Sequence, residues 1–301
     1  MNYFIMGLKI VVLTPTYNRG GDLSNLYRSL CDQENKQFSW VIVDDGSPES
    51  VDSIVEAMRL NADYPIIFYK KNNGGKSSAI NYALDKFEKD VFLIIIDDDE
   101  ILHKDAINIV TKYANQYKDS NVGMIDFNRA YSDGTIIGNP IFNDDYMMTV
   151  QERRKKGIFS DGYTGYYMSK LGDTRFPIFE GERYIGPSVL SMLISMQYSI
   201  LWTQPVLGHT EYLDGGLTRQ GRKLRVKNPR SMAYYCMLMQ SPDSGFKYRF
   251  TYAVLYSAYL YYANIKKFNP GINYDLCLPI ITRPLGLLLS KYWRFKFRNR
   301  K

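Results

Sequence analysis

The stretch VFLIIIDDDE, residues 91–100, decides the fold. Its first six residues are apolar and mostly β-branched, which is typical of a strand buried on both faces of a parallel sheet. Four acids follow at once, and carboxylates gathered at a strand end repel one another unless a cation lies among them. Mg²⁺ and Mn²⁺ prefer oxygen ligands and often bind carboxylates together with substrate phosphates. Residues two apart in an extended segment point the same way, so Asp97 and Asp99 are candidate metal ligands, with a solvated acidic turn as the alternative.

The chain before this stretch alternates between strand and helix. Apolar runs predict strands at residues 9–13, 40–43 and 66–69, and helical spacing predicts helices at 22–33 (capped by Asp22), 50–60, 77–87 and 104–117. The alternation indicates an α/β fold with a mostly parallel sheet flanked by helices. Polar clusters follow three of the four strands, and ligands of such sheets bind outside the carboxyl ends of the strands. We therefore expect the functional site at the edge of the sheet where the strands end, here called the rim.

The second half of the chain loses this alternation. Residues 122–128 predict one more strand, residues 185–202 a buried helix, and the Tyr-rich segment from Pro229 onward a set of helices. The predicted division is a catalytic part at 1–225, with nucleotide-binding residues 1–130 and an acceptor part at 131–225, and a helical, basic region at 226–301.

Composition excludes several classes of protein. Hydrophobic residues make up 45% of the 301 residues, which argues against global disorder. The three cysteines are far apart, which argues against a disulfide scaffold or a zinc site and fits a reducing cytosol. The first residues lack a basic segment and a cleavage site, so they predict a lead-in to a strand and a cytoplasmic protein. No GxGxxG follows the first strand, which argues against a dinucleotide-dependent dehydrogenase.

Two further polar segments lie on the predicted rim. Asp44 and Asp45 begin a DDGS turn after a buried strand, where they would bond a base or ribose, or simply form the turn. The NNGGKSS segment, residues 72–78, lacks the first glycine of a phosphate-binding P-loop, because Lys70 stands there. Gly75 and Lys76 still open a helix, which is a candidate anion site.

Taken together, these segments resemble family 2 glycosyltransferases. The similarity lies in TPTYNR at residues 14–19, VDDGS at 43–47, NGG at 73–75 and IDDD at 96–99, in that order and spacing, and covers about the first 130 residues. The resemblance implies a GT-A fold, a divalent Mn²⁺ or Mg²⁺ ion, a nucleotide-sugar donor, most often UDP-linked, and inversion at the anomeric carbon. The implied nucleotide-binding residues are Pro15, Tyr17, Arg19, Asp44 or Asp45 (at the base), Gly75, Lys76, Asp97 and Asp98. Asp97 and Asp99 form the implied DXD pair, with Asp99 the more direct metal ligand.

Such enzymes also carry an acidic general base well after the DXD pair. The candidates are Glu180 and Glu182 in FEGERY, residues 179–184, and Glu182 is preferred because it lies nearer the following apolar segment. A surface loop with two acids is the alternative. His209 is a candidate third metal ligand, although a lone histidine is more often structural. The basic cluster of Arg219, Arg222, Lys223 and Arg225 would neutralise a diphosphate or form a solvated loop.

The last twelve residues, SKYWRFKFRNRK, interleave aromatic and basic side chains. Such a pattern suits nucleic acid or an anionic membrane surface, and we favour the membrane because the first half of the chain already implies a sugar substrate. The expected partners are then a nucleotide sugar and a saccharide or lipid-linked acceptor at the inner face of the membrane. Packing back on the catalytic part is the alternative. Competing functions are a sugar-phosphate nucleotidyltransferase, which would need a glycine-rich loop where PTYNR stands, and a non-catalytic sugar-binding protein.

Overall fold

The computed structural model describes residues 8–139, 143–159, 161–210, 217–266, 268, 271 and 277–298. The chain forms two compact units. The first, here the sheet unit, comprises Met1–Met148, Ile158–Arg175 and Ile194–Glu211; the second, here the helical unit, comprises Thr149–Gly157, Phe176–Leu193 and Tyr212–Lys301. The sequence placed a boundary at residue 225, which lies inside helix α8 (Leu217–Lys227). The helical unit therefore draws segments from the predicted acceptor part, and the functional division stays a prediction.

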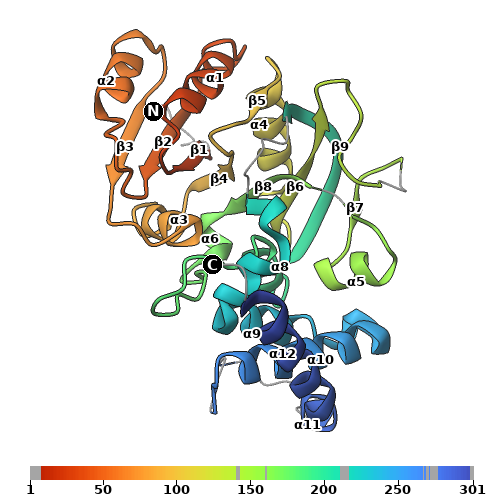
Figure 1. Cartoon of the computed structure of the whole chain (residues 1–301). Coiled ribbons are helices and arrows are strands. Elements are labelled where there is room, and N and C mark those ends of the chain that lie inside the picture. The colour runs from red at the N-terminus through yellow and green to blue at the C-terminus, as the bar shows by residue number, and fades with distance from the viewer. Residues whose placement is uncertain are drawn as a thin grey trace. The chain divides into compact units, whose positions relative to one another are not determined.

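In the described part of the chain, nine strands form one mixed sheet in the sheet unit (Figure 1). Strands β3 (Ile66–Lys70), β2 (Phe38–Asp44), β1 (Lys9–Thr16) and β4 (Val91–Ile95) are parallel neighbours in that order. The sheet continues through β8 (Gly162–Tyr167), β6 (Val122–Tyr131), β9 (Ser199–Thr210) and β5 (Ile101–Leu102), and β7 (Tyr146–Met147) pairs with β9. The predicted parallel core is confirmed, and the antiparallel pairings of β8 extend it.

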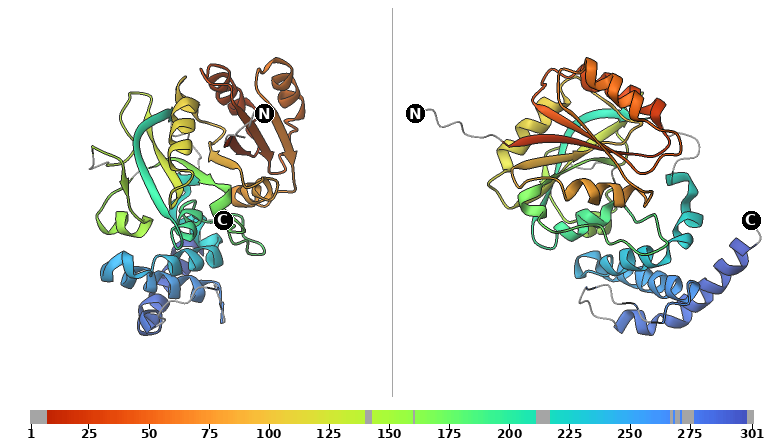
Figure 2. Two further views of the ribbon diagram at one scale, coloured as in Figure 1. Left: turned by 180° about the vertical axis from the view of Figure 1, so that it is seen from behind. Right: turned by 90° about the vertical axis from the view of Figure 1, so that its left-hand side faces the viewer.

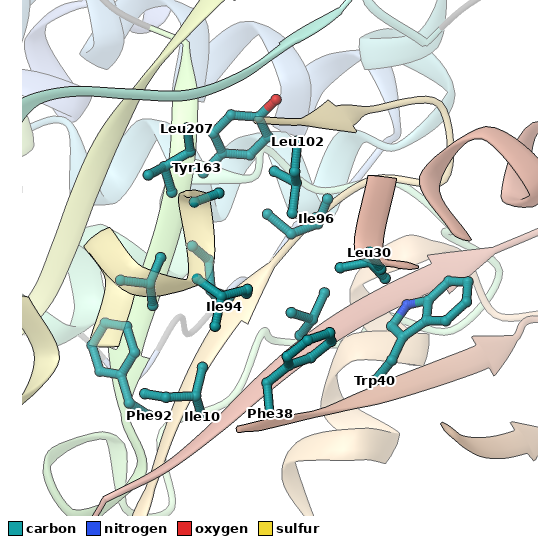
Figure 3. Close-up of a cluster of buried hydrophobic side chains, with 14 of the residues drawn as sticks. Ile10, Leu30, Phe38, Trp40, Phe92, Ile94, Ile96, Leu102, Tyr163 and Leu207 are labelled. Atoms are coloured by element: carbon teal, nitrogen blue, oxygen red, sulfur yellow. The ribbon is translucent and has the colours of Figure 1, made fainter. Parts of the chain in front are cut away.

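Helices cover both faces of this sheet, as the right-hand view in Figure 2 shows. On one face α1 (Gly20–Cys31), α2 (Asp52–Asn61) and α4 (Ala106–Tyr117) share a buried core with β1, β2 and β4. That core includes Trp40, Phe92 and Ile94 (Figure 3), and the Trp40 indole is satisfied by Thr14 Oγ1 at 2.9 Å. On the other face α3 (Lys76–Leu84) contacts β1 and β2. The short α6 (Met168–Leu171) follows β8.

Two local predictions are corrected by the structure. Helix α1 begins at Gly20, after Arg19, and Asp22 lies in its first turn. There its charge interacts favourably with the helix dipole, but Asp22 is not the N-cap residue. Residues 185–202 were expected to form one buried helix. Only α7 (Ser188–Ile194) is helical there, and β9 begins at Ser199, because its β-branched and aromatic residues pair with β6 inside the sheet.

The helical unit contains α5 (Val150–Lys155), α8, α9 (Pro229–Leu238), the 3₁₀ turn η1 (Pro242–Ser244), α10 (Gly245–Tyr262), α11 (Cys277–Ile281) and α12 (Arg283–Arg298). Helix α9 is buried almost throughout and packs on α10, which also packs on α12. The predicted helical C-terminal region is therefore confirmed. Among the described residues, we find no helix with the length and apolar character needed to cross a membrane.

Candidate functional site

The predicted rim is formed by the carboxyl ends of β1, β2 and β4. Parallel pairing sets Thr16 opposite Asp44 and Leu13 opposite Ile95, so the segments that follow the three strands emerge at the same edge. Pro15 lies near the end of β1, and Tyr17 just beyond it is 46% exposed. The structure thus brings together the polar segments that lie up to 80 residues apart in the sequence.

Thr16 and Arg19 hold the second and third acids of the DDDE segment. Thr16 Oγ1 donates to Asp98 Oδ2 at 2.7 Å, and Arg19 Nη1 donates to Asp98 Oδ1 at 3.2 Å and to Asp99 Oδ2 at 2.7 Å. Burial raises the pKa of Asp98 to about 6, against the opposing effects of Thr16 and Arg19 and with the help of the neighbouring carboxylates Asp97 and Asp99. Arg19, predicted to line the nucleotide pocket, is therefore also a counter-charge of the acidic segment.

Lys76 holds the first acid. Gly75, at φ 90°, precedes α3, and Lys76 is the first residue of that helix. Lys76 Nζ donates to both carboxylate oxygens of Asp97, at 2.5 and 2.7 Å. Burial opposes both charges, yet the ion pair lowers the pKa of Asp97 and raises the pKa of Lys76. The predicted anion-binding lysine is thus directed at the acidic segment, and its role in binding a diphosphate stays a prediction.

The two acids of the DDGS turn have different surroundings. Asp45 is a loop anchor: its carboxylate accepts bonds from Lys71 Nζ at 2.7 Å, Gly74 N at 3.0 Å and Gly75 N at 2.6 Å. Asp44 is fully buried, and its Oδ1 accepts from Ser47 N and Oγ, while its Oδ2 has no partner among the described residues. Which of the two contacts a base stays a prediction.

Gly46 and Ser47 complete this turn, and the sequence had not assigned either of them a role in the site. Gly46 has φ 77°, and a Cβ there would approach Asn73 N at 2.8 Å, so the close contact between the two loops requires glycine. Ser47 Oγ accepts from the backbone N–H of Asn18, at 2.7 Å, and Asn18 itself has φ 55°. Their signal in the sequence was the VDDGS segment at residues 43–47, in which both were assigned only to the turn.

A metal-binding geometry exists at this rim. Asp97, Asp99 and Glu100 can each offer one carboxylate oxygen, with these atoms within 4.8 Å of one another. Three hard oxygen donors suit Mg²⁺ or Mn²⁺, so the residues fit the predicted ion. Glu100 was quoted in the acidic segment but was not predicted as a ligand. His209 is not a member of this group; its ring lies 5.9 Å from the ring of His103, and its role as a ligand stays a prediction.

Glu100 also belongs to a buried network that the sequence did not reveal. Arg129 on β6 forms ion pairs with Glu100 and Asp161, and Tyr163 on β8 donates to Glu100 Oε2 at 2.8 Å. Burial raises the pKa of Glu100 to about 7, opposed by Arg129 and assisted by Asp97. Arg129 lies one residue beyond the predicted strand of residues 122–128, and no motif around it indicated a role.

The candidate bases lie in the helical unit. Glu182 Oε1 and Oε2 accept from the backbone N–H groups of Arg230 and Ser231, both at 2.8 Å, which satisfies two otherwise unpaired donors at the start of α9. Asn228, the residue before α9, instead accepts from the backbone of Arg183 and Tyr184. Glu180 is exposed. Glu182 is therefore held in place by a helix N-terminus, and the choice of base stays a prediction.

The basic cluster of α8 does not act as one patch. Arg222 donates to Tyr259 Oη at 2.9 Å and lies over the Trp293 ring, so it ties α8 to α10 and α12. Lys223 and Arg225 are exposed, and the side chain of Arg219 lies outside the described residues.

Comparisons with known proteins agree with this architecture. The crystal structure of Staphylococcus aureus TarS 1–349 in complex with UDP-GlcNAc superposes with a TM-score of 0.61 at 18% identity, covering 84% of this chain and 71% of that one. Mannosyltransferase PcManGT from Pyrobaculum calidifontis, in complex with GDP-Man and Mn²⁺, gives a TM-score of 0.57 at 14% identity, covering 97% and 88%. The GT-A fold predicted from the sequence is confirmed.

Comparison of the sequence with those of known proteins identifies the family. TarS, a poly(ribitol-phosphate) beta-N-acetylglucosaminyltransferase, is 28% identical over 112 residues, 36% of this chain and 19% of its own length. A Campylobacter jejuni GalNAc(5)-diNAcBac-PP-undecaprenol beta-1,3-glucosyltransferase is 26% identical over 113 residues, 36% of this chain and 35% of its own length. These matches span well under two thirds of either relative. The model of glycosyl transferase family 2 matches residues 11–172, more than half of the chain, and the chain belongs to that family.

Proposed function

We propose that this chain is a metal-dependent, inverting glycosyltransferase that moves a sugar from a UDP-linked donor to a saccharide or lipid-linked saccharide acceptor in surface polysaccharide synthesis. The observation that carries the proposal is the rim of β1, β2 and β4, where Asp97, Asp99 and Glu100 gather. Family membership supports the reaction class. The UDP-GlcNAc bound by TarS supports a UDP-linked donor, and the undecaprenol-linked substrate named for the C. jejuni relative supports a lipid-linked acceptor.

In this proposal different rim residues bind the metal ion, the phosphates and the nucleoside of the donor. Asp97, Asp99 and Glu100 hold a divalent ion, which would supply positive charge to the diphosphate. Lys76 and Arg19 lie against the same acids and add cationic donors for the phosphates. Asp45 keeps the loop of residues 72–75 in place, and Tyr17, which is exposed, is available to the nucleoside. Asp44 is fully buried and supports the turn through Ser47.

A panel of nucleotide sugars tests the proposal. UDP-, dTDP- and GDP-linked hexoses and N-acetylhexosamines are each assayed by calorimetry, and for slow hydrolysis, with Mn²⁺, with Mg²⁺ and with EDTA. We expect one UDP-sugar to bind more tightly than the others and only with metal present. Metal-independent binding, or no binding of any nucleotide sugar, would overturn the proposal.

Glu182→Gln tests the general base. Glutamine keeps one acceptor oxygen, so one N–H at the start of α9 loses its partner, and we expect a loss of about 1 kcal/mol in the free energy of unfolding. If Glu182 deprotonates the acceptor, turnover falls at least about 10²-fold while donor affinity is retained. Chemical denaturation and steady-state kinetics give the two values.

Glu152→Gln is the matched control for Glu182. Glu152 closes a capping box with Thr149 at the start of α5 in the same unit, and glutamine can also close that box, so the variant removes a carboxylate charge at a helix start without removing a candidate base. We expect turnover unchanged in this variant. An inactive Glu180→Gln with an active Glu182→Gln would assign the base to Glu180, and full activity in both would place the base elsewhere.

A further inference from the structure

Helix α12 packs into the helical unit through an unusual face. The buried residues are mostly small: Thr282, directly before the helix, and Gly286 and Ser290 within it. Trp293 is the large side chain buried with them. A Cβ on Gly286 would lie 2.5 Å from Ser257 Cβ and 2.9 Å from Ala258 N, so the backbone of α12 runs close against α10. The contact is close and fixes which side of α12 faces outward.

Trp293 anchors this contact. Its ring lies 4.9 Å from the Tyr259 ring and is only 3% exposed. Arg294 also points back, donating through Nη2 to the carbonyls of Tyr261 and Tyr262. The sequence had grouped Trp293 with the aromatic residues that meet a membrane, and the structure corrects this, since its side chain fills the space between α10 and α12.

The opposite side of α12 carries the large apolar side chains. They recur at intervals of four and three residues, which places them along one side of the helix, and they are 47–77% exposed. We call them the outer stripe: Leu285, Leu288, Tyr292 and Phe295 of α12, together with Ile281 at the end of α11. A helix in water normally buries its leucines and exposes its small polar residues, and α12 does the reverse. The exposed outer stripe therefore indicates a surface that binds an apolar partner.

Charge decides which partner fits. Lys291 and Lys296 flank the outer stripe on its two sides, and residues 277–301 contain no Asp or Glu. A second copy of α12 seated on the outer stripe would bring like charges together along the edges of a helix pair, which disfavours self-association. An anionic lipid surface complements the same residues, because lysine and arginine meet the headgroups while leucine and phenylalanine enter the acyl boundary.

We propose that the outer stripe of α12 docks this chain on an anionic lipid bilayer. The helix lies along the surface with the stripe inserted, and Trp293 holds it from behind. This assignment rests on the exposed residues and their charge, and does not depend on which sugar the sheet unit binds.

Vesicle co-sedimentation of the full chain tests the assignment. The wild type is compared on phosphatidylcholine vesicles and on mixed phosphatidylglycerol–phosphatidylcholine vesicles. We expect binding to the anionic vesicles, weakened by salt. The double variant Leu288→Ser/Phe295→Ser is expected to bind at least about tenfold more weakly, because both side chains would enter the bilayer. Lys291→Gln and Lys296→Gln are each expected to weaken binding about fivefold.

Phe246→Ser and Leu60→Ser are matched controls. These side chains are 71% and 85% exposed but lie outside the stripe, on α10 and α2, so binding should be unchanged. Circular dichroism should show all variants folded. No binding by the wild type, or equal binding by wild type and double variant, would overturn the proposal. A wild-type dimer in light scattering that becomes monomeric in the double variant would assign the stripe to a second copy and overturn it as well.

Discussion

Asp97→Asn and Asp99→Asn are each expected to lower sugar transfer by about 10³-fold or more with the fold retained. Removing a carboxylate ligand removes several kcal/mol of charge stabilisation that a divalent ion gives a diphosphate, and each 1.4 kcal/mol is about tenfold in rate. Asp97 and Asp99 are two of the three acids whose oxygens come together at the rim. Initial rates and Mn²⁺ titration followed by electron paramagnetic resonance check the prediction, the second without reliance on activity.

Asp105→Asn is the control for these two variants. Asp105 is an exposed acid just before α4, six residues beyond Asp99, and its side chain makes no capping bond. Both activity and Mn²⁺ binding should be unchanged in it. Wild-type turnover by the Asp97 and Asp99 variants, with EDTA present, would show that the acids serve some purpose other than metal binding.

Arg129→Met is expected to lower the free energy of unfolding by about 3–5 kcal/mol. Its side chain is 11% exposed and pairs with Glu100, which is 2% exposed, so the substitution leaves a buried carboxylate without its cation. Methionine keeps much of the side-chain volume, so the loss measures charge and not a cavity. Urea unfolding followed by circular dichroism gives the value.

The loss should depend on pH in a direction that identifies Glu100. The pKa of Glu100, about 7 in the folded chain against an ordinary 4.5, rises further without Arg129. Between the unfolded-state pKa of 4.5 and the folded-state pKa of about 7, the folded chain binds more protons at Glu100 than the unfolded chain does. The free energy of unfolding therefore falls as the pH rises through this range. The difference between wild type and Arg129→Met should therefore be larger at pH 8 than at pH 5.5.

Arg175→Met provides the comparison for Arg129. Arg175 pairs with Asp85, which is 64% exposed, and solvated ion pairs contribute about 1 kcal/mol or less. The Arg175 variant should therefore lose little stability at either pH. If Arg129→Met lowers the free energy of unfolding no more than Arg175→Met does, groups other than Arg129 compensate the charge of Glu100, and the Arg129–Glu100 ion pair does not stabilise the fold.

The sequence by itself determined the strands and helices around β1, β2 and β4 and the rim on which their polar segments lie. Near-continuous apolar runs predict buried parallel strands, and residues that follow consecutive parallel strands must meet at one edge. Asp97 and Asp99 were therefore identifiable as candidate metal ligands, and the resemblance to family 2 followed from the four motifs. Periodicity failed at residues 185–202, where strand pairing with β6 decided between helix and strand.

Only the tertiary structure decided the partners of these residues. Lys76 was predicted to bind an anion, and its pairing with Asp97 follows from the packing of α3 on β1 and β2. Arg129 meets Glu100 because β6 and β8 pair beyond β4, an order that the sequence does not encode locally. For α12 the sequence predicted a helical region rich in basic and aromatic residues, but not which side of the helix is buried. The close approach to α10 at Gly286 selects the small residues for the interior and leaves the outer stripe exposed.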